Sequence, residues 1–448
     1  MAEREPIGVV GAGWVGLVTA ACFAELGHRV IVREIVPAKV ESLRRGEVPI
    51  HEPGLPEMIE RNRERLTFTT EMDELLDDAP RLLFVCVQTP PTHSGDADLS
   101  AVQRAVEEIG ETGDKALVMK STVPVGTGRT IRRDAPDLAY VSCPEFLRES
   151  TALHDFMHPD RVVIGGEPGD EWAADAVEAL YEPLGAPILR MDVASAEMVK
   201  LASNAFLATK ISFINEIANV CEEVGADVSQ VSKGMGLDDR IGPKFLRAGA
   251  GYSGSCLPKD VTGLKQLAGN SGYAFQLLTS VIEVNEMQKR RLVGKLAKHL
   301  GSLVGKRIAV LGLAFKPDTD DMREAASLVL TGRLESEGAV VVAYDPIAEH
   351  QARELMPSVE MAPSALEALD GADGAVLVTE WPQFAELDWA EVAKRMANPL
   401  LVDGRNFLDP ETVRAAGITY EAIGRPSAGD PSAAPARVAP GRGAEAES

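Results

Sequence analysis

The sequence lacks an excess of basic residues. It has 45 lysines and arginines against 68 aspartates and glutamates, which gives a net charge of −23. Nucleic acids and anionic membrane surfaces are bound by basic faces, so this charge disfavours both as partners. A small anionic ligand remains compatible with the composition, provided that local basic residues bind it.

Paired cysteines, clustered histidines and long apolar runs are also missing. The cysteines are odd in number, contain no CxxC pair and argue against a disulfide framework or structural zinc; they are residues 22, 86, 143, 221 and 256. The seven histidines show no HExxH spacing, so we expect no metal. No apolar run reaches the length of a membrane span, and the first residues lack the features of a secretory signal. We therefore expect a cytoplasmic protein.

Residues 1–192 open with a strand, a glycine turn and a helix. The apolar strand Ile7–Val10 leads into GAGWVG at 11–16, and the next strand ends at Glu34. Glycines at this spacing allow pyrophosphate to approach a helix N-terminus, and the acid accepts hydrogen bonds from a ribose. An ordinary strand-to-helix turn is the alternative, and Arg33 raises the further alternative of a 2′-phosphate. We predict an NAD-binding Rossmann-like domain.

Further apolar runs continue this α/β pattern at Leu82–Val87, Leu117–Lys120 and Arg161–Ile164. Polar loops follow the first two runs and contain Thr89 and Thr122. Because ligands of open α/β sheets lie at the carboxyl ends of strands, both threonines are candidates for cofactor or substrate contact. Spacing alone favours the simpler interpretation that they cap a helix or a turn.

The pattern changes twice further along the chain. Residues 193–300 contain amphipathic helices, and one of them, around 194–224, is long enough to join domains or to pack against another subunit. Residues 301–425 return to an α/β pattern without the glycine motif. Residues 426–448 are rich in Pro, Ala, Gly and Ser and are expected to form a disordered tail. The predicted fold is α/β, with two Rossmann-like doubly wound domains joined by a central helical dimerisation region.

Two polar residues of the long helix stand out. Lys200 and Asn204 are four positions apart and share one face of the helix. Their neighbours are apolar nearly all round, and lysine is almost never fully buried without a partner. A functional role for Lys200 is therefore indicated.

The segment 251–260, GYSGSCLPKD, places Cys256 on a glycine-rich turn. Pro258 suits the first turn of a helix, so Cys256 is expected at a helix start, with Lys259 and Asp260 following. A thiol is a strong nucleophile as the thiolate, and a nearby lysine or a helix N-terminus lowers its pKa. The alternative is a buried structural cysteine.

One thiol, one buried lysine and two carboxylates are the minimum set of side chains for oxidising an alcohol twice at the same carbon with a hydride-accepting cofactor. The thiolate holds the intermediate aldehyde as a thiohemiacetal, whose oxidation gives a thioester. The lysine ammonium stabilises the developing oxyanion, and a carboxylate assists water in cleaving the thioester.

With these motifs together, the chain resembles the UDP-glucose/GDP-mannose dehydrogenase family from Ile7 to about Ile423. The resemblance rests on GAGWVG (11–16), PIHEPGL (49–55), STVPVGT (121–127), PEFLRES (144–150), KLASNAFLATKISFINE (200–216), GYSGSCLPKD (251–260), FKPDTDDMRE (315–324) and DGRN (403–406). It implies an NAD-dependent, four-electron oxidation of the C6 hydroxymethyl of a nucleotide sugar to a carboxylate, through a thiohemiacetal and a thioester.

The resemblance also implies residue roles. Cys256 is the nucleophile, Lys200 and Asn204 line the reacting C6 oxygen, Asp260 with Thr122 holds a water or takes the proton, and Glu145 is a candidate base for hydrolysis. The implied cofactor contacts, with Glu149 near the nicotinamide, are Gly11, Gly13, Val15, Gly16, Glu34, Lys39, Thr89, Thr122, Glu149, Lys259 and Arg323. The implied substrate contacts are Glu145, Phe146, Leu147, Arg148, Glu149, Lys200, Asn204, Arg240, Phe245, Leu246, Arg247, Ala248, Gly249, Ser253 and Lys316. Arg240 matches an arginine that reaches the neighbouring subunit's site, which implies a homodimer.

Substrate identity is left open between several nucleotide sugars. UDP-glucose is implied first, and GDP-mannose, another UDP-hexose or a UDP-N-acetylhexosamine are the alternatives. The chain departs from the family pattern at Ser253, where glycine is usual, at Leu257, at QTP (88–90) and at Glu34, where aspartate is typical.

Two other classes of function fit these residues less well. A binding or regulatory protein that has lost turnover would be expected to lack Cys256, Lys200 or Asp260, and all three are present. A simple two-electron dehydrogenase would leave Cys256 idle, and the number of NADH formed per product separates it from the double oxidation.

Overall fold

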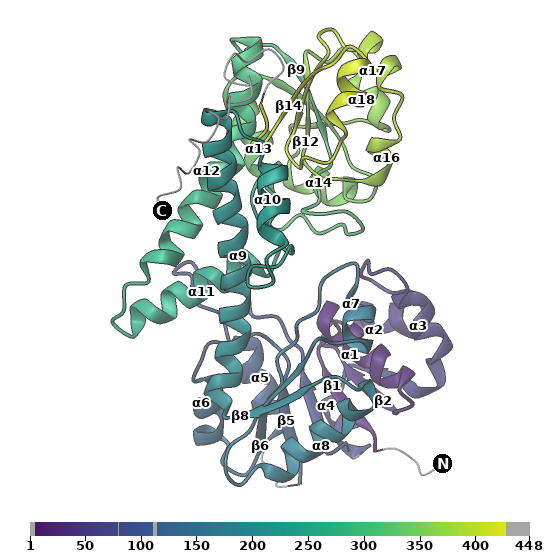
Figure 1. Ribbon diagram of the computed structural model, residues 1–448. Coiled ribbons are helices and arrows are strands. Elements are labelled where there is room, and N and C mark those ends of the chain that lie inside the picture. The colour runs from purple at the N-terminus through teal and green to yellow at the C-terminus, as the bar shows by residue number, and fades with distance from the viewer. Residues whose placement is uncertain (1–4, 79, 111–113, 427–448) are drawn as a thin grey trace, which may run out of the picture. The chain divides into compact units, whose positions relative to one another are not determined.

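The computed structural model describes residues 5–78, 80–110 and 114–426. These residues form two compact units, each of which contains its own sheet (Figure 1). Apart from Pro426, the predicted tail lies outside the described residues.

The first unit comprises the chain up to Thr209 together with 253–282 and 314–324. Its eight-stranded sheet contains β1 (Ile7–Val10), β2 (Val30–Arg33), β3 (Leu66–Thr69), β4 (Leu82–Val85), β5 (Ala116–Met119), β6 (Ala139–Ser142), β7 (Val162–Gly165) and β8 (Ile188–Met191). The spatial order is β3-β2-β1-β4-β5-β6-β7-β8. All neighbouring strands are parallel except β6 and β7.

Helices cover both faces of this sheet (Figure 1). Successive strand residues enter two separate cores: Val9 and Val32 pack into one, and Val10 and Ile31 into the other. Strands buried on both faces are what a doubly wound fold requires. The helices are α1 (Trp14–Glu25), α2 (Pro37–Arg44), α3 (Leu55–Arg61), α4 (Met72–Asp77), α5 (Ser100–Ile109), α6 (Thr127–Asp134), α7 (Ala152–Met157), α8 (Glu171–Tyr181) and α11 (Leu257–Asn270), with short 3-10 helices at Arg63–Arg65 and Glu182–Leu184.

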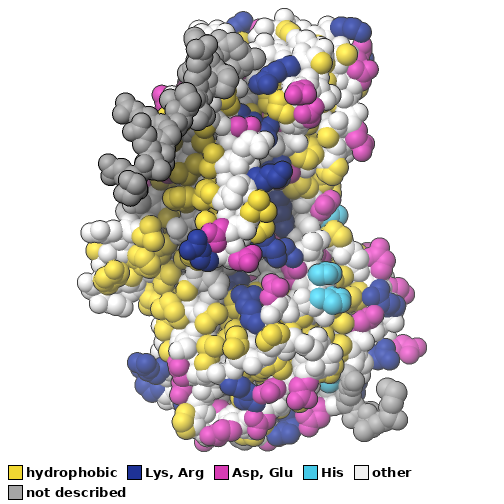
Figure 2. Space-filling model, in the orientation of Figure 1, with side chains coloured by type: hydrophobic (Ala, Val, Ile, Leu, Met, Phe, Trp, Pro, Cys, Tyr) yellow, Lys and Arg dark blue, Asp and Glu magenta, His cyan; other side chains and the backbone are white. Residues whose placement is uncertain are grey.

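Two long helices contribute residues to both units. Helix α9 (Val193–Val224) confirms the long helix that was predicted around 194–224, and α12 (Gln276–Leu300) is the second. Several large side chains of α9 remain exposed, among them Phe206 at 66%. Figure 2 shows hydrophobic side chains gathered over α11 and the neighbouring part of α12. Within the described ranges, no helix combines the length and the apolar character needed to cross a bilayer.

The second unit comprises 210–252, 283–313 and the chain from Ala325. Its six strands lie in the order β11-β10-β9-β12-β13-β14, and all neighbouring pairs are parallel. The strands are β9 (Arg307–Leu311), β10 (Val340–Tyr344), β11 (Glu360–Met361), β12 (Gly374–Leu377), β13 (Leu400–Asp403) and β14 (Thr419–Ala422). The helices are α10 (Val228–Gly236), α13 (Ala326–Ser336), α14 (Glu349–Leu355), α15 (Ala365–Leu369), α16 (Pro382–Ala385), α17 (Trp389–Arg395) and α18 (Pro410–Ala415).

The predicted α/β class with two Rossmann-like sheets is confirmed. The first sheet departs from the expectation of a purely parallel arrangement at the β6–β7 pair. Three of its strands, β3, β6 and β8, were not predicted. Strand β8 is only partly buried, so its sequence lacks the continuous apolar run by which buried strands are recognised.

Candidate functional site

The glycine turn between β1 and α1 has the space that a dinucleotide needs. Gly11 has a φ of +102°, and a Cβ there would lie 2.8 Å from the carbonyl oxygen of Cys86. A Cβ at Gly16 would lie 1.9 Å from the carbonyl oxygen of Gly11. Open space surrounds Gly13, the N-cap of α1, and no acidic side chain lies in the first turn, which contains Val15. The N-terminus of α1 therefore presents backbone N–H groups to a pyrophosphate.

Glu34 lies beside this turn. Its Oε2 accepts a hydrogen bond of 3.1 Å from the backbone N–H of Ala12, and the residue is buried. Lys39 Nζ lies 3.9 Å from the same oxygen. A carboxylate held at the end of β2 is placed as a ribose acceptor, so these residues fit NAD.

We expect NAD⁺ to be preferred over NADP⁺ by about 100-fold in kcat/KM, because the Glu34 carboxylate repels a 2′-phosphate. Arg33, the residue that could attract that phosphate, is instead paired with Glu108 at 2.8 Å. Steady-state assays with both cofactors measure the ratio of the two kcat/KM values. Glu34→Ala should bring this ratio closer to one. A higher kcat/KM for NADP⁺ would show that Arg33 faces the ribose.

Lys200 and Glu145 form a buried ion pair, with Nζ 2.7 Å from Oε1. Burial alone would lower the pKa of Lys200, but the charges of Glu145, Asp260 and Cys256 outweigh burial and raise it. Burial alone would raise the pKa of Glu145, but Lys200 outweighs it and the pKa of this carboxyl is lowered. The predicted buried lysine therefore has a charged partner, which the sequence spacing did not reveal.

A second chain of polar contacts leads away from α9. Asn204 Nδ2 donates to Asp260 Oδ2 at 2.6 Å, and Lys259 Nζ lies 3.4 Å from Asp260 Oδ1. Lys259 also donates to the Thr89 hydroxyl at 3.1 Å, and that hydroxyl donates to the carbonyl oxygen of Thr122 at 2.8 Å. The structure thus brings together five of the predicted site residues. The hydroxyl of Thr89 joins two loops rather than capping a helix.

Cys256 is the N-cap of α11, and Pro258 lies in the first turn, as predicted. It is exposed, whereas the other four cysteines are buried. The prediction that the pKa of the Cys256 thiol is lowered is wrong. Burial together with the carboxylates of Glu145 and Asp260 raises the pKa of Cys256, and the opposing charge of Lys200 does not compensate.

Glu149 lies close to the Cys256 turn. Its Oε1 is 3.5 Å from the hydroxyl of Ser255 and 3.7 Å from Arg323 Nη2. Burial, followed by the charge of Asp321, raises the pKa of Glu149 to about 7. A carboxyl with this pKa is suited to taking up and returning a proton near neutral pH.

The segment that follows Glu145 lies against the lysine. The ring of Phe146 has the Arg161 guanidinium 3.5 Å from its centroid, and Lys200 Nζ 5.7 Å from it. The backbone N–H of Leu147 donates to Glu145 Oε2 at 2.6 Å. This backbone contact fixes the carboxylate that pairs with the lysine.

Three other predicted substrate positions lie in the same unit. Arg148 is committed to a double hydrogen bond with Asp155. Lys316 Nζ donates to the carbonyl oxygen of Glu149. Ser253 is buried, and its hydroxyl finds no hydrogen-bond partner among the described residues. An unpartnered buried hydroxyl is a candidate ligand contact.

Glu52 is a residue of this site to which the sequence reasoning gave no role. Its carboxylate accepts hydrogen bonds from Trp14 Nε1 at 2.8 Å and from the backbone N–H groups of Ser150 and Ala152 at 2.9 Å each. It therefore ties the glycine turn to the end of the Glu145 segment. The available signal was its position in the PIHEPGL motif at 49–55.

The remaining predicted substrate positions belong to the second unit. The side chain of Arg240 is 88% exposed and pairs with Asp238 at 2.6 Å. Phe245 has a φ of +64°, which is strained for a residue other than glycine. Leu246 and Ala248 are buried.

Arg247 and Gly249 complete this second group. Arg247 donates to the carbonyl oxygen of Arg405 at 3.0 Å and lies 3.4 Å from Glu380. A Cβ at Gly249 would lie 2.8 Å from the carbonyl oxygen of Gly404. All predicted catalytic residues, by contrast, lie in the first unit. No three potential metal ligands are grouped together anywhere in the part of the chain that the structure describes.

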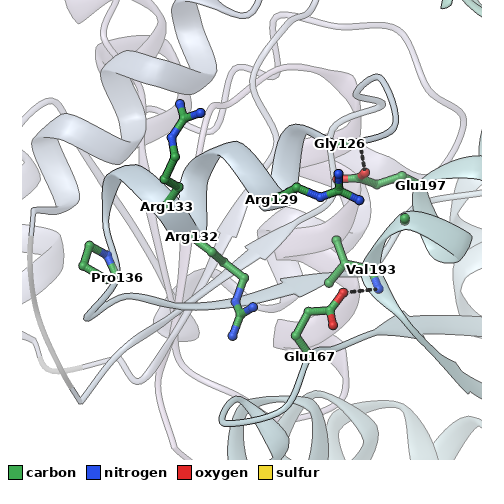
Figure 3. A pocket seen from close by; sticks show the side chains of 9 residues that line it. Gly126, Arg129, Arg132, Arg133, Pro136, Glu167, Val193 and Glu197 are labelled. Carbon is green, nitrogen blue, oxygen red and sulfur yellow. Dashed lines mark hydrogen bonds between the residues drawn. The ribbon is translucent and has the colours of Figure 1, made fainter. Parts of the chain in front are cut away.

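A cavity of about 550 Å³ in the first unit is separate from these residues (Figure 3). Two of its charged groups, Glu197 and Arg132, are held by partners within the protein. Glu197 accepts from the backbone N–H groups of Gly126 and Gly128 at 2.7 and 2.8 Å, and Arg132 pairs with Asp170 at 2.9 Å. None of the predicted catalytic residues lines this cavity.

Three family models match the chain in order. They describe the NAD binding domain, the central domain and the UDP binding domain of the UDP-glucose/GDP-mannose dehydrogenase family, and they match residues 5–185, 194–287 and 309–410.

Individual proteins are similar over most of their length. A UDP-glucose 6-dehydrogenase of Bacillus subtilis, TuaD, is 46% identical over 94% of this chain and 93% of its own. The structure of a UDP-glucose dehydrogenase from Pyrobaculum islandicum has a TM-score of 0.87 and 39% identity, over 95% of this chain and 99% of that one. A UDP-D-ManNAc dehydrogenase structure from Pyrococcus horikoshii has a TM-score of 0.83 and 27% identity, over 94% and 99%.

Proposed function

The chain belongs to the UDP-glucose/GDP-mannose dehydrogenase family, and on this premise we propose that it oxidises the C6 hydroxymethyl of UDP-glucose to a carboxylate with NAD⁺. The observation that carries the proposal is the grouping of Lys200, Asn204 and Asp260 with Glu145 beside the exposed thiol of Cys256. Oxidation at one carbon to the level of an acid needs a nucleophile, a cation and carboxylates together.

NAD⁺ would be held by the glycine turn at 11–16 and by Glu34, with Thr89 and Lys259 on the neighbouring loops. Bound NAD⁺ supplies the hydride acceptor for both oxidations. The paired contact of Lys259 with Thr89 and Asp260 links the cofactor side of the site to its catalytic side.

In the first oxidation, Asn204 and Lys200 orient the C6 hydroxyl. Its proton leaves through the water that Asp260 and Thr122 are proposed to hold, and the ammonium of Lys200 stabilises the alkoxide. Loss of a hydride from C6 to the bound acceptor then gives the aldehyde. The aldehyde is then captured by Cys256. The thiol gives up its proton, sulfur bonds to C6 as the C=O double bond becomes single, and the former aldehyde oxygen takes up a proton to give a thiohemiacetal.

In the second oxidation the thiohemiacetal loses its hydroxyl proton and a hydride and becomes a thioester. Water then attacks the thioester carbon, the C–S bond breaks, and the sulfur leaves as a thiolate. We propose Glu145 as the base for this water, because its lowered pKa keeps it ionised. We propose that Glu149 exchanges a proton with the thiol through the Ser255 hydroxyl, which lies 3.5 Å from Glu149 Oε1 and 3.6 Å from Cys256 Sγ.

The assignment of glucose as the sugar and UDP as the nucleotide is supported by the similarity to the UDP-glucose dehydrogenases of Bacillus subtilis and Pyrobaculum islandicum. The unpartnered hydroxyl of Ser253 is the feature of the first unit that could instead favour another sugar. The test is a panel of UDP-glucose, UDP-N-acetylmannosamine and GDP-mannose with NAD⁺, followed by NADH absorbance. UDP-glucose should have the highest kcat/KM, by at least about 100-fold, because even a small change of shape in a substrate is discriminated by up to about that factor. A higher value for GDP-mannose or the N-acetylated sugar would overturn the substrate assignment.

We propose the same three functional regions as the sequence predicts: an NAD-binding region at 1–192, a helical region at 193–300 and a nucleotide-sugar region at 301–425. Each of the three family models falls within one of them. The free, unbridged cysteines suit a reducing cytoplasm.

We also propose that the enzyme is a homodimer formed through α9. An apolar groove of about 590 Å³ lies in the first unit between α9, α11 and the start of α12. Phe206, Tyr273 and Leu277 line it and are 66%, 65% and 57% exposed. Apolar surface of this kind usually marks a subunit interface. The high exposure of Arg240 suits a residue that reaches a partner's site.

Mixing Arg240→Ala with Cys256→Ala protomers is expected to restore part of the activity that each variant lacks alone. If Arg240 acts across the interface, the mixed dimer contains one site that lacks both groups and one that is intact. The assay is NADH formation after subunit exchange, which is verified by two affinity tags. Exchange without recovered activity would show that Arg240 serves its own protomer or no site.

A further inference from the structure

We propose that Asn215, Asn285 and Gln288 are positioning residues that hold the loop 249–252 of the second unit, and with it the adjoining segment 245–248, ready for the nucleotide sugar. The inference rests on the proposed role of that segment in substrate binding. It assigns a role to three buried amides that the reaction itself does not use.

Asn285 of α12 holds the end of the loop. Its Oδ1 accepts from the backbone N–H of Tyr252 at 2.7 Å, and its Nδ2 donates to the carbonyl oxygen of Tyr252 at 3.0 Å. One side-chain amide thus satisfies both backbone polar groups of a single residue. Gly251, which has a φ of +96°, packs so closely that a Cβ there would lie 2.6 Å from Asn285 Oδ1.

Two further amides hold the beginning of the loop. Asn215 of α9 accepts from the backbone N–H of Gly249 at 2.9 Å, and Gln288 of α12 donates to the carbonyl oxygen of Gly249 at 3.0 Å. Both backbone polar groups of Gly249 are therefore used within the protein. Gly249 contributes to the site by fixing its neighbours rather than by offering the ligand a hydrogen bond.

The DGRN motif at 403–406 holds the opposite side of the loop. The backbone N–H of Ala250 donates to the carbonyl oxygen of Gly404 at 2.8 Å, and Arg405 Nη1 lies 3.5 Å from the carbonyl oxygen of Gly251. The loop is thus fixed between two helices and the end of β13.

The burial of these three amides is explained by their hydrogen bonds to the loop 249–252. Asn215, Asn285 and Gln288 are 0%, 2% and 1% exposed. Burying an amide is unfavourable unless it is hydrogen-bonded, and apolar side chains would pack two helices at less cost. Asn215 Nδ2 has no partner among the described residues, so its oxygen, which binds Gly249, is the useful group.

The backbone conformation of Phe245 explains why the neighbouring loop 249–252 must be held rigidly. Its positive φ stores strain, and a strained residue keeps its conformation only when the surrounding structure holds it. The loop at 249–252 begins four residues later. A loosened loop lets the segment relax, and the ligand must then reorder it on binding.

The test is Asn285→Asp, which keeps the acceptor for Tyr252 and replaces the donor with a carboxylate oxygen that repels the carbonyl. We expect KM for UDP-glucose and Kd for UDP to rise about tenfold, with kcat and KM for NAD⁺ changed less than about twofold. Burial raises the pKa of a carboxyl at this position, and the protonated form donates to the carbonyl again, so the rise should be smaller at pH 6 than at pH 8. Gln230→Glu, the same kind of change on an exposed amide of the same unit, is the control.

Gln288→Met is the second variant, and it too should raise KM for the sugar nucleotide. If Asn285→Asp does not fold, the result for Gln288→Met alone decides the inference. Unchanged KM and Kd would overturn the inference. So would an equal loss in kcat, both KM values and melting temperature, since that is the result of general destabilisation. If the wild-type enzyme fails to oxidise UDP-glucose, the proposed substrate is wrong, and the positioning role is then decided by the affinity for UDP alone.

Discussion

Replacing Cys256 by serine is expected to lower the rate of acid formation by at least about 10⁴-fold, as loss of a nucleophile does in other covalent enzymes. Affinity for NAD⁺ should not change, because the glycine turn and Glu34 lie in a different part of the first unit's sequence and keep their contacts. A hydroxyl is far less acidic than a thiol, so the serine cannot capture the aldehyde at a useful rate. NADH formation and NAD⁺ titration measure the two effects.

Cys221→Ser, at a buried cysteine of α9 in the second unit, is the matched control and should keep wild-type turnover. Wild-type turnover in Cys256→Ser would refute the thioester route. Loss of both activity and NAD⁺ binding would mean that the substitution disturbs the unit as a whole.

Replacing Lys200 by methionine is the second large effect, with a loss of about 10³-fold in kcat, the usual consequence of removing an oxyanion-stabilising group. The substitution also leaves Glu145 buried without its cation, so the pKa of that carboxyl should rise. Because Lys200 lowers the pKa of Cys256, its removal should raise that pKa further. The rate of Cys256 alkylation by iodoacetamide should then increase only at a higher pH than in the wild type.

Lys265→Met, on an exposed lysine of α11, controls for loss of a positive charge on the helix that Cys256 caps. The four buried cysteines contribute little to alkylation. An unchanged alkylation profile in Lys200→Met would show that the lysine does not act on the thiol, and full activity would remove it from the proposed mechanism.

Features encoded in short stretches of sequence were predicted well. The glycine turn at 11–16, the helix start at Cys256 and the long helix α9 follow from local spacing and periodicity, which tertiary contacts did not override. The same holds for the two α/β sheets, whose buried strands carry continuous apolar runs.

Features that depend on pairs of residues far apart in the chain were not predictable. The partner of Lys200 is 55 residues away, and Glu52 reaches Ser150 across 98. The raised pKa of Cys256 depends on burial and on the carboxylates of Glu145 and Asp260, all of which arise on folding, so the nearby lysine alone predicted the wrong direction. The amides Asn215 and Asn285 sit in ordinary helical sequence, and only their burial and contacts mark them.

The number of NADH formed per UDP-glucose consumed, measured with semicarbazide present to trap free aldehyde, tests the central claim most directly. An enzyme that holds the intermediate on Cys256 through both oxidations gives two NADH per sugar and no semicarbazone, because the aldehyde is never released. One NADH per sugar, or a trapped aldehyde in proportion to turnover, would contradict the account.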